Sequence, residues 1–448
     1  MFIKAIKEKL FGGCCSRFGQ FDVQEAKLSA SPKTRLDLAE GRFDLFALNR
    51  HQDAIWGVST DQKLFIKIGV SSNPRKANSL KEEGEILAHL TEKGTWTAPK
   101  LCNRGTLNAA QAQDLSKVFG VSLDPDLGYM ICDFIPSKKS LLLGDVLLAV
   151  IEQKKAGVFQ GDLKPNNVRA VDNYAKLIDY DQALILTKEQ SEMPNREFLR
   201  WAGERAKKIF GKECLFEDFG FKNFEDVLST LFIGDSLDLS KTSIFLESDT
   251  TRAENKIYHT LSGPDVCVQG VRVLDERRKL LDQVEFSSGE KTLDIGCNIG
   301  LLCHYLADRG CMPSGHDIDS GIINAARIIA NITSRKISFA SADLDKLEKI
   351  EPVDTVFIFS VLHHTQNVEA NAAKIAQACQ RVFIECRLSE RGAKPISQGN
   401  WISTSTWSFE NVQSLVAYLE KIFPSFHLVK NYGQCDKGRF LLELRKEV

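Results

Sequence analysis

The sequence predicts a two-domain protein, with an α+β domain in the N-terminal half and an α/β domain in the C-terminal half. The chain has 448 residues, more than one hydrophobic core usually organises, so two domains of roughly 200 residues each are expected. Strands and then helices are predicted in the first half, whereas strands and helices alternate in the second. We place the domains at residues 41–248 and 249–448, after a leader of residues 1–40.

The composition is that of a globular protein with no strong charge bias. Lys and Arg number 58 against 59 Asp and Glu, which disfavours a nucleic-acid partner. The twelve cysteines form no CxxC pair, so neither a zinc ribbon nor a disulfide framework is indicated, and a cytoplasmic location is expected.

No apolar run is long enough to predict a transmembrane helix. The residues Phe2, Ile3, Ile6 and Leu10 would share one side of a short N-terminal helix. Packing of this helix on its own domain is favoured, and peripheral contact with the inner membrane is the alternative.

The N-terminal domain is expected to begin with three strands and a helix, at residues 43–48, 54–59, 64–70 and 77–91. Lys67 lies in the middle of the third strand. A lysine that holds phosphate oxygens needs a carboxylate to orient it. Glu83 is the best candidate, because apolar residues three and four positions further on share its helical face. Glu82 and Glu85 are expected to be solvated.

A second group of polar residues follows in the strings Gly-Asp-Leu-Lys-Pro-Asn-Asn, residues 161–167, and Ile-Asp-Tyr, residues 178–180. Asp162 is placed to accept or orient the proton of an attacking hydroxyl, and Lys164 to neutralise a migrating phosphoryl group. Asn167 and Asp179 are predicted to hold Mg²⁺ against the phosphate oxygens of ATP. The order and gaps of these residues predict a phosphotransferase.

These strings resemble those of the compact kinases that act on lipopolysaccharide sugars, and the resemblance implies a bilobal protein-kinase-like fold. Gln160 stands where those kinases usually have a histidine that supports the structure. Residues 49–57 lack the GxGxxG pattern, so Arg50 or main-chain amides would have to contact the phosphates there. No Ala-Pro-Glu sequence follows Tyr180, which indicates a substrate other than a protein.

The C-terminal domain is expected to alternate between strands and helices and to end in an antiparallel hairpin. The predicted strands are residues 291–297, 312–318, 336–342, 354–361 and 381–386, the helices are 299–309, 320–332 and 368–380, and the hairpin lies within 426–444. A hairpin that closes a parallel sheet is typical of class I S-adenosylmethionine-dependent methyltransferases, which this half resembles over nearly its whole length. The resemblance implies a Rossmann-like, seven-stranded fold.

The loop Asp-Ile-Gly-Cys-Asn-Ile-Gly, residues 294–300, follows the first of these strands. It contains Gly296 and Gly300, with Asn298 in place of the middle glycine of the dinucleotide fingerprint. The carboxylate of Asp294 would face the charged amino-acid end of S-adenosylmethionine. This loop therefore favours a methyltransferase over a dehydrogenase.

Two further acids are expected to bind the same cofactor. Asp317, at the end of the second strand, would take the ribose hydroxyls, with Asp319 as the competing candidate. Asp343 matches the acid that meets the adenine amino group in these methyltransferases.

Two adjacent histidines, His363 and His364, end the fourth strand at the edge where ligands bind in such sheets. They are candidates to orient or deprotonate an acceptor, or to attract an anionic one. The alternative is that one of them caps the next helix and packs against the cofactor. Glu385 is a weaker candidate, and Arg277 is expected to be a solvated helix charge rather than a ligand for an anionic acceptor.

A kinase-like and a methyltransferase domain in one chain resemble the bacterial bifunctional kinase–methyltransferases that end O-antigen chains, with the domain order reversed. The resemblance implies phosphorylation of a sugar hydroxyl on a cell-surface glycan or glycolipid, followed by methyl transfer. The alternative is a small-molecule or sugar methyltransferase with a regulatory or binding pseudokinase domain. An RNA methyltransferase is disfavoured by the near-neutral charge.

Overall fold

The computed structural model divides the chain into two compact units. It describes residues 21–22, 31–48, 53–71, 76–123, 126, 128–136, 140–171, 174–212, 214–245, 257–387, 411–435 and 439–447. The first unit comprises Met1–Leu246 and Pro264–Cys267, and the second comprises Glu247–Gly263 and Val268–Val448. The short segment 264–267 joins the first unit because β16 (Val266–Cys267) pairs in parallel with β14 (Ser236–Asp238). A single boundary after residue 248 was predicted from the sequence instead.

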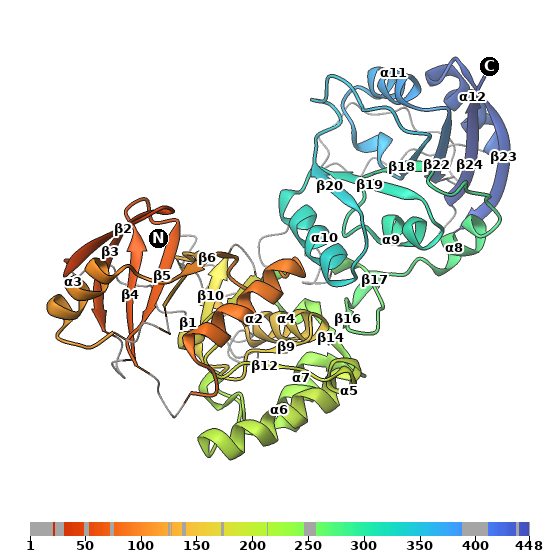
Figure 1. The fold of residues 1–448 in the computed structure, drawn as a ribbon. Coiled ribbons are helices and arrows are strands. Elements are labelled where there is room, and N and C mark those ends of the chain that lie inside the picture. Colours follow the sequence, from red (N-terminus) through yellow and green to blue (C-terminus); the bar gives the residue numbers. More distant parts are fainter. Residues whose placement is uncertain are drawn as a thin grey trace, which may run out of the picture. The chain divides into compact units, whose positions relative to one another are not determined.

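A six-stranded antiparallel sheet opens the first unit, with the strand order β2-β3-β4-β5-β7-β6 (Figure 1). Its strands are β2 (Thr34–Leu38), β3 (Gly41–Leu48), β4 (Ala54–Ser59), β5 (Leu64–Gly69), β6 (Leu101–Gly105) and β7 (Tyr129–Asp133). The strands predicted between residues 43 and 70 are confirmed. The edge strand β2 falls in the residues assigned to a leader, because only Leu36 and Leu38 mark its apolar face.

Helix α2 (Leu80–Glu92) carries one of the predicted site residues. Ser79 precedes it in a capping box: its hydroxyl oxygen accepts a hydrogen bond from the amide of Glu82, and its own amide donates to the Glu82 carboxylate. This cap makes the helix begin three residues later than the sequence analysis expected. The helix buries Glu83 together with Ile86, Leu87 and Leu90, so the acid lies on the apolar face as predicted.

The rest of the first unit is mostly helical, built around α4 (Leu143–Lys155), which is buried along nearly its whole length. The hairpin of β10 (Val168–Val171) and β11 (Tyr174–Leu177) packs against α4. The remaining elements are β1 (Phe21–Asp22), α3 (Ala109–Phe119), β8 (Ser140–Leu141), β9 (Val158–Phe159), η2 (Pro165–Asn167), β12 (Leu184–Ile185), α5 (Lys188–Glu192), α6 (Asn195–Phe210), η3 (Glu217–Phe219), α7 (Phe224–Leu231), β13 (Phe232–Ile233), η4 (Leu239–Lys241) and η5 (Ser243–Phe245). The predicted amphipathic helix at residues 1–11 lies outside the described residues.

The second unit is built on a seven-stranded sheet with the order β20-β19-β18-β21-β22-β24-β23. Its strands are β18 (Lys291–Ile295), β19 (Met312–Asp317), β20 (Ser338–Ser341), β21 (Thr355–Phe359), β22 (Arg381–Arg387), β23 (Phe426–Cys435) and β24 (Arg439–Lys446). All neighbouring pairs are parallel except those of β24, which is antiparallel to both β22 and β23. The predicted alternation and closing hairpin are thus confirmed.

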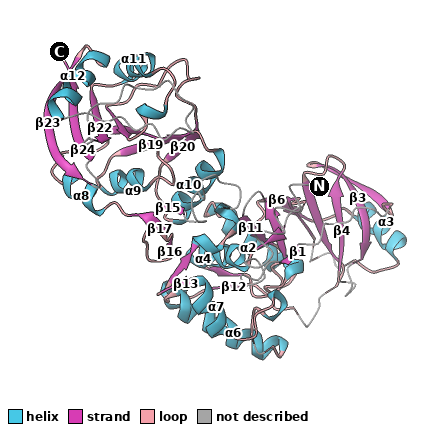
Figure 2. Ribbon diagram, turned by 180° about the vertical axis from the view of Figure 1, so that it is seen from behind, coloured by secondary structure: helices cyan, strands magenta, loops and turns pink. Residues whose placement is uncertain are grey.

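Helices cover both faces of this sheet (Figures 1 and 2). The helices α8 (Asp275–Leu281), α9 (Leu301–Asp308) and α10 (Ser320–Ile332) lie on one face, and α11 (Val368–Ala378) and α12 (Val412–Ile422) on the other. The unit also contains β15 (Ile257–His259), β17 (Gly270–Arg272) and η7 (Leu362–His364). Because β18, β19, β21 and β22 are parallel, the loops that follow them meet at one edge of the sheet.

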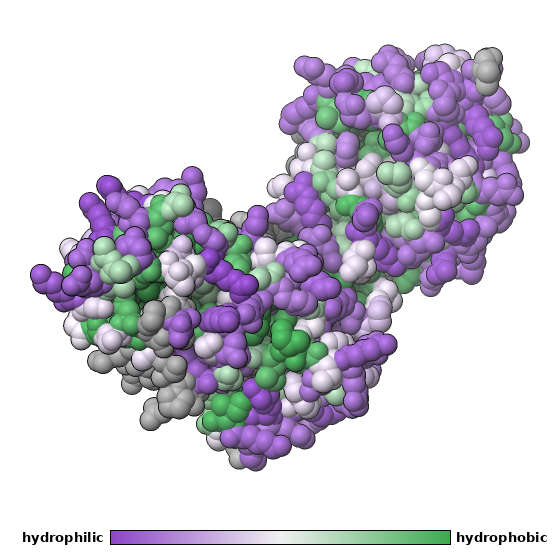
Figure 3. Space-filling view, in the orientation of Figure 1, coloured by the Kyte–Doolittle hydropathy of each residue, from purple (hydrophilic) through white to green (hydrophobic). Residues whose placement is uncertain are grey.

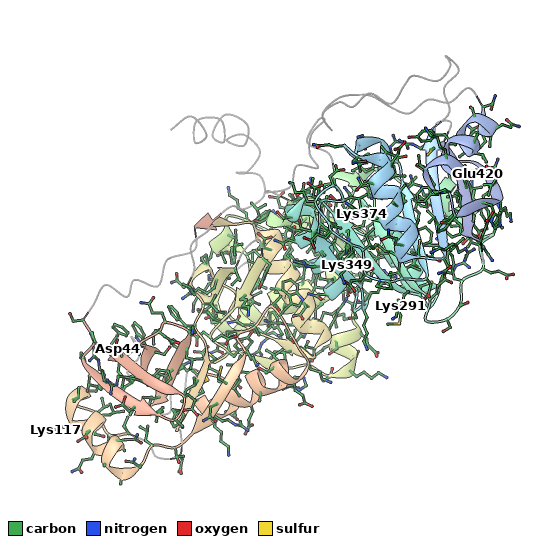
Figure 4. The ribbon with its side chains drawn as sticks, turned by 90° about the horizontal axis from the view of Figure 1, so that it is seen from above. Asp44, Lys117, Lys291, Lys349, Lys374 and Glu420 are labelled. Atoms are coloured by element: carbon green, nitrogen blue, oxygen red, sulfur yellow. The ribbon has the colours of Figure 1, made fainter. Side chains whose placement is uncertain are left out.

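The surface of both units is mostly hydrophilic, as is typical of globular proteins. Hydrophilic residues cover most of the face drawn in Figure 3, and hydrophobic residues appear in smaller patches. Figure 4 marks the first unit by Asp44 of β3 and Lys117 of α3, and the second by Lys291 of β18 and Lys374 of α11. None of the described helices combines the length and apolar character that crossing a bilayer requires.

Replacement by Ala is expected to change the stability of the first unit in opposite directions at two of its helical glycines. A Cβ added at Gly84 of α2 would meet only the Cδ of Arg104, at 3.7 Å, so Gly84→Ala should stabilise the unit by about 0.5–1 kcal/mol through helix propensity. A Cβ at Gly203 of α6 would lie 2.2 Å from the Phe224 ring, so Gly203→Ala should destabilise it by about 1–3 kcal/mol. Urea denaturation of the full chain measures both changes. Equal effects of the two substitutions would contradict this account of the packing.

Candidate active sites

A cavity of about 470 Å³ lies in the first unit. Strands β4, β5 and β7 provide one part of its wall, and the segments 166–169 and 178–180 provide another. The sequence-predicted residues Lys67, Glu83, Asn167 and Asp179 all line it. Residues spread over more than 100 positions of the sequence therefore meet around one space.

Lys67 is the centre of an ion-pair network at the wall of this cavity. Its Nζ lies 2.7 Å from Glu83 Oε2 and 3.1 Å from Asp179 Oδ1. Burial alone would lower the pKa of Lys67, but Asp179 and Glu83 outweigh it, so the pKa is raised and the ammonium stays charged. Glu83 also accepts a hydrogen bond from the amide of Tyr180, at 3.1 Å, which ties α2 to the segment that carries Asp179.

The loop after β9 positions the other predicted residues through Gln160. Its Nε2 donates to the carbonyl oxygens of Ile178 and Asp179, at 2.9 and 2.7 Å, and its Oε1 accepts from the amide of Asp162, at 2.9 Å. Asn167 donates to both the carbonyl and the carboxylate of Asp162, each at 3.0 Å. Lys164 forms an ion pair with the same carboxylate. The side chain that replaces the expected histidine thus joins the two halves of the site.

A second lysine, which the sequence analysis missed, lines the same cavity. Lys76 Nζ lies 3.1 Å from Asp53 Oδ2 and 3.1 Å from Asp181 Oδ2. Its position just before α2 follows no familiar motif.

The described residues contain no cluster of three or more His, Cys, Asp or Glu side chains that could hold a metal ion by itself. Asn167 and Asp179 supply one amide oxygen and one carboxylate. Mg²⁺ commonly takes only one or two protein ligands and completes its shell with phosphate oxygens and water. The residues present therefore fit Mg²⁺ only in company with a phosphate ligand.

The second unit gathers its predicted residues at the carboxyl edge of the sheet. Asp294 is buried on β18, and burial raises its pKa to about 7, with Arg277 opposing the shift and Asp317 adding to it. The loop that follows bends sharply, with φ angles of 78° at Gly296, 52° at Asn298 and 80° at Gly300. A Cβ added at Gly296 would lie 2.3 Å from Val361, so this turn has no room for a larger residue.

Asp317 and Asp319 differ in what their carboxylates contact. Asp317 Oδ2 accepts from the amide of Asn298, at 2.9 Å, which places it against the loop. Asp319 caps α10 by accepting from the amides of Gly321 and Ile322, at 2.8 and 3.1 Å. The cap gives Asp319 a structural role, and it leaves Asp317 as the acid beside the loop.

The remaining candidates lie around the ends of β20, β21 and β22. Asp343 follows β20 and forms an exposed ion pair with Lys346, at 3.0 Å. His364 lies in η7, where partial desolvation of its ring lowers its pKa. The side chain of His363 lies outside the described part of the chain.

Arg277 was expected to be solvated, and the structure corrects this. Its Nε and Nη2 donate to the two carboxylate oxygens of Glu385, at 2.5 and 3.1 Å, and Glu385 is fully buried at the end of β22. Ser360 donates to the same carboxylate, at 2.9 Å. A bidentate pair of this kind joins α8 to the carboxyl edge of the sheet, and its partners are too distant in sequence for a pattern to reveal.

The residues present fit S-adenosylmethionine. The Oδ1 of Asn298 is buried without a hydrogen-bond partner among the described residues, and such an atom is costly unless a ligand satisfies it. Asp294 lies on β18 just before this loop, and a cationic ligand would favour the ionised form of its carboxyl, whose pKa is raised to about 7 by burial.

Comparisons with known proteins concern the second unit. Residues 292–383 match the family described as methyltransferase domain. A ubiquinone biosynthesis O-methyltransferase of Idiomarina loihiensis is 30% identical over 97 residues, which cover 21% of this chain and 38% of that protein. A phosphoethanolamine N-methyltransferase of Plasmodium falciparum is 32% identical over 110 residues, covering 24% of this chain and 40% of that protein. The chain thus spans about two fifths of the length of these relatives.

Among solved structures, the N-terminal domain of EvdMO1 with SAH and D-fucose is 16% identical, with a TM-score of 0.33, covering 42% of this chain and 90% of that one. On the family match and the curated relatives, the C-terminal region contains a class I S-adenosylmethionine-dependent methyltransferase domain.

The raised pKa of Asp294 predicts a pH dependence. The pKa of this carboxyl is about 7 in the folded protein and about 3.9 in the unfolded chain. Between these two pH values the folded protein binds the proton more tightly than the unfolded chain does, so the free energy of unfolding falls as the pH rises. The ionised carboxylate attracts a ligand ammonium, so affinity for S-adenosylhomocysteine should rise by up to about tenfold from pH 6 to 8. Titration calorimetry of wild type and Asp294→Asn measures this. A variant that keeps the wild-type slope would contradict the assignment.

Asp317 and Asp319 offer a matched pair of substitutions. Asp317→Asn should weaken S-adenosylhomocysteine binding by about tenfold or more, because a charged hydrogen bond to the ligand is lost. Asp319→Asn should change the affinity by less than about twofold, because Asn caps a helix as well as Asp does. The dissociation constants of both variants decide between the two acids. The opposite ranking would make Asp319 the ligand-binding residue.

Proposed function

We propose that the chain is a bifunctional transferase, in which the first unit transfers a phosphoryl group from ATP with Mg²⁺ and the second transfers a methyl group from S-adenosylmethionine. The observation that carries the first activity is the Lys67 ammonium, held by Glu83 and Asp179 at the wall of the cavity that Asn167 also lines. A fixed, charged lysine beside a carboxylate and an amide is the arrangement that binds a metal-bound triphosphate.

The residues of the first unit divide the work of phosphoryl transfer. Lys67 supplies a positive charge to phosphate oxygens, and Glu83 keeps its ammonium in place. Asp162 is held by Asn167 and paired with Lys164, so its carboxylate can orient an attacking hydroxyl and take its proton. Asn167 and Asp179 would hold Mg²⁺, which offsets the negative charge of the phosphate groups when bound.

In the second unit, the proposed roles follow from the position of each acid. Asp317 would accept hydrogen bonds from the ribose hydroxyls, and Asp294 would face the charged amino-acid end of S-adenosylmethionine. Asp343 would meet the adenine amino group. His364 is a candidate to deprotonate the acceptor, because its lowered pKa favours the neutral imidazole that can accept a proton.

A cell-surface glycan or glycolipid is the proposed acceptor. The resemblance to the kinase–methyltransferases that end O-antigen chains supports it, as does the missing protein-substrate sequence after Tyr180. The curated relatives named as O-methyltransferases support transfer to oxygen. The order proposed is phosphorylation first and methylation second, in the cytoplasm.

The two activities should separate by mutation. Asp162→Ala should reduce ATP- and Mg²⁺-dependent phosphorylation of purified cell-envelope glycans by about 100-fold or more, because the proton acceptor is lost. Methylation of glycan already phosphorylated by the wild type should persist, because that site lies in the other unit. Mass spectrometry of the glycans, after ATP and then after S-adenosylmethionine, measures both steps.

Asp44→Asn is the matched control, because Asp44 lies on β3 and pairs with the exposed Arg35, outside the cavity lining (Figure 4). The control should phosphorylate as the wild type does. A wild type that gains methyl but never phosphate, while binding ATP, would instead support a regulatory or binding role for the first unit.

A further inference from the structure

We propose that Lys76 is a second phosphate-binding lysine of the cavity, oriented by Asp53 and Asp181, and that it contacts the terminal phosphates of a nucleoside triphosphate. The proposal rests on the nucleotide site proposed for the first unit and adds a residue to it. The expected glycine-rich pattern is missing from residues 49–57, so the phosphates need another source of positive charge or hydrogen-bond donors.

The arrangement of Lys76 repeats that of Lys67. Each lysine lines the cavity, and each is held by two carboxylates from different elements: Glu83 and Asp179 hold Lys67, and Asp53 and Asp181 hold Lys76. The side chains of Lys67 and Lys76 are only 12% and 15% exposed. A long, flexible side chain is fixed in this way only by partners that restrain it from several sides.

The two ammonium groups are close enough to affect each other. Burial and the charge of Lys67 both act to lower the pKa of Lys76, and Asp181, Asp179 and Asp53 outweigh them, so its pKa is raised. Each ammonium is held by two carboxylates, so the two lysines would act on a ligand as fixed, charged hydrogen-bond donors rather than as excess positive charge. The phosphate oxygens of a triphosphate that carries Mg²⁺ offer acceptors for both, whereas a nucleoside has no phosphate oxygens.

Only one of the two carboxylate oxygens of Asp181 has a partner among the described residues. Its Oδ2 pairs with Lys76, but its Oδ1 is buried without a hydrogen-bond partner among the described residues. A buried carboxylate oxygen left without a donor is costly. The cost is understandable if Asp181 positions an ammonium for a ligand rather than serving as one half of a closed structural pair.

The test compares ligands with and without phosphates on the full chain. Calorimetry with ATP and Mg²⁺ should show that Lys76→Met binds ATP at least about tenfold more weakly than wild type does, because a charge-assisted hydrogen bond is lost. Binding of adenosine should stay within about twofold, because a nucleoside has no group for this lysine. The control Lys63→Met removes an exposed lysine that pairs with Asp61 in the turn between β4 and β5, outside the cavity lining, and it should bind both ligands as wild type does.

The outcomes separate this inference from the proposed function. A wild type that binds no ATP would overturn both. A wild type that binds ATP, with Lys76→Met binding it equally well, would overturn the role of Lys76 alone. Equal losses for ATP and adenosine would also overturn it, because they would show a general loss of the cavity.

A measurement on the wild type covers the case in which Lys76→Met does not fold. Brief treatment with a small amine-acetylating reagent, followed by peptide mass spectrometry, reports the reactivity of Lys76. ATP with Mg²⁺ should protect Lys76 from acetylation while adenosine does not, and Lys63 should react equally in both samples. Unchanged labelling of Lys76 in the presence of saturating ATP would overturn the proposal.

Discussion

The buried ammonium of Lys67 is the interaction on which the first unit depends. It joins β5, α2 and the segment after β11, because its two carboxylate partners come from the helix and from that segment. Removing one partner of a buried ion pair leaves an uncompensated charge, which typically costs about 3–5 kcal/mol. The same network that orients the lysine therefore also fixes the two parts of the cavity wall, and site and fold are built from the same contacts.

In the second unit a different constraint brings the site residues together, which is the common direction of the parallel strands. Asp294 and Asp317 end adjacent strands, and the positive φ angles of the loop between them bring the amide of Asn298 to Asp317. The pair of Arg277 and Glu385 adds α8 to the same edge. No long-range ion network is needed to collect the acids here, because the topology of the sheet already does so.

The contrast explains how far the sequence could predict each site. The acids of the second unit follow strand ends and a glycine loop, which are local patterns, so Asp294 and Asp317 could be located from the sequence. The pairing of Lys67 with Glu83 could also be expected from a strand and a helix face. Lys76 could not, because its partners lie on separate segments and no local pattern joins them. The prediction of a solvated Arg277 was wrong for the same reason: the 108 positions that separate it from Glu385 hide the contact.

The balance of buried charge distinguishes the ligands that the two sites favour. In the first unit the cations stay charged because carboxylates compensate them, and two such lysines face one cavity. In the second unit burial raises the pKa of Asp294 to about 7, because Arg277 offsets the cost of its charge incompletely. Lysines fixed in a cavity can donate to anionic groups, whereas a buried carboxyl with a raised pKa is ionised more readily beside a positively charged ligand. These two environments are the physical basis on which a triphosphate is proposed for the first unit and S-adenosylmethionine for the second.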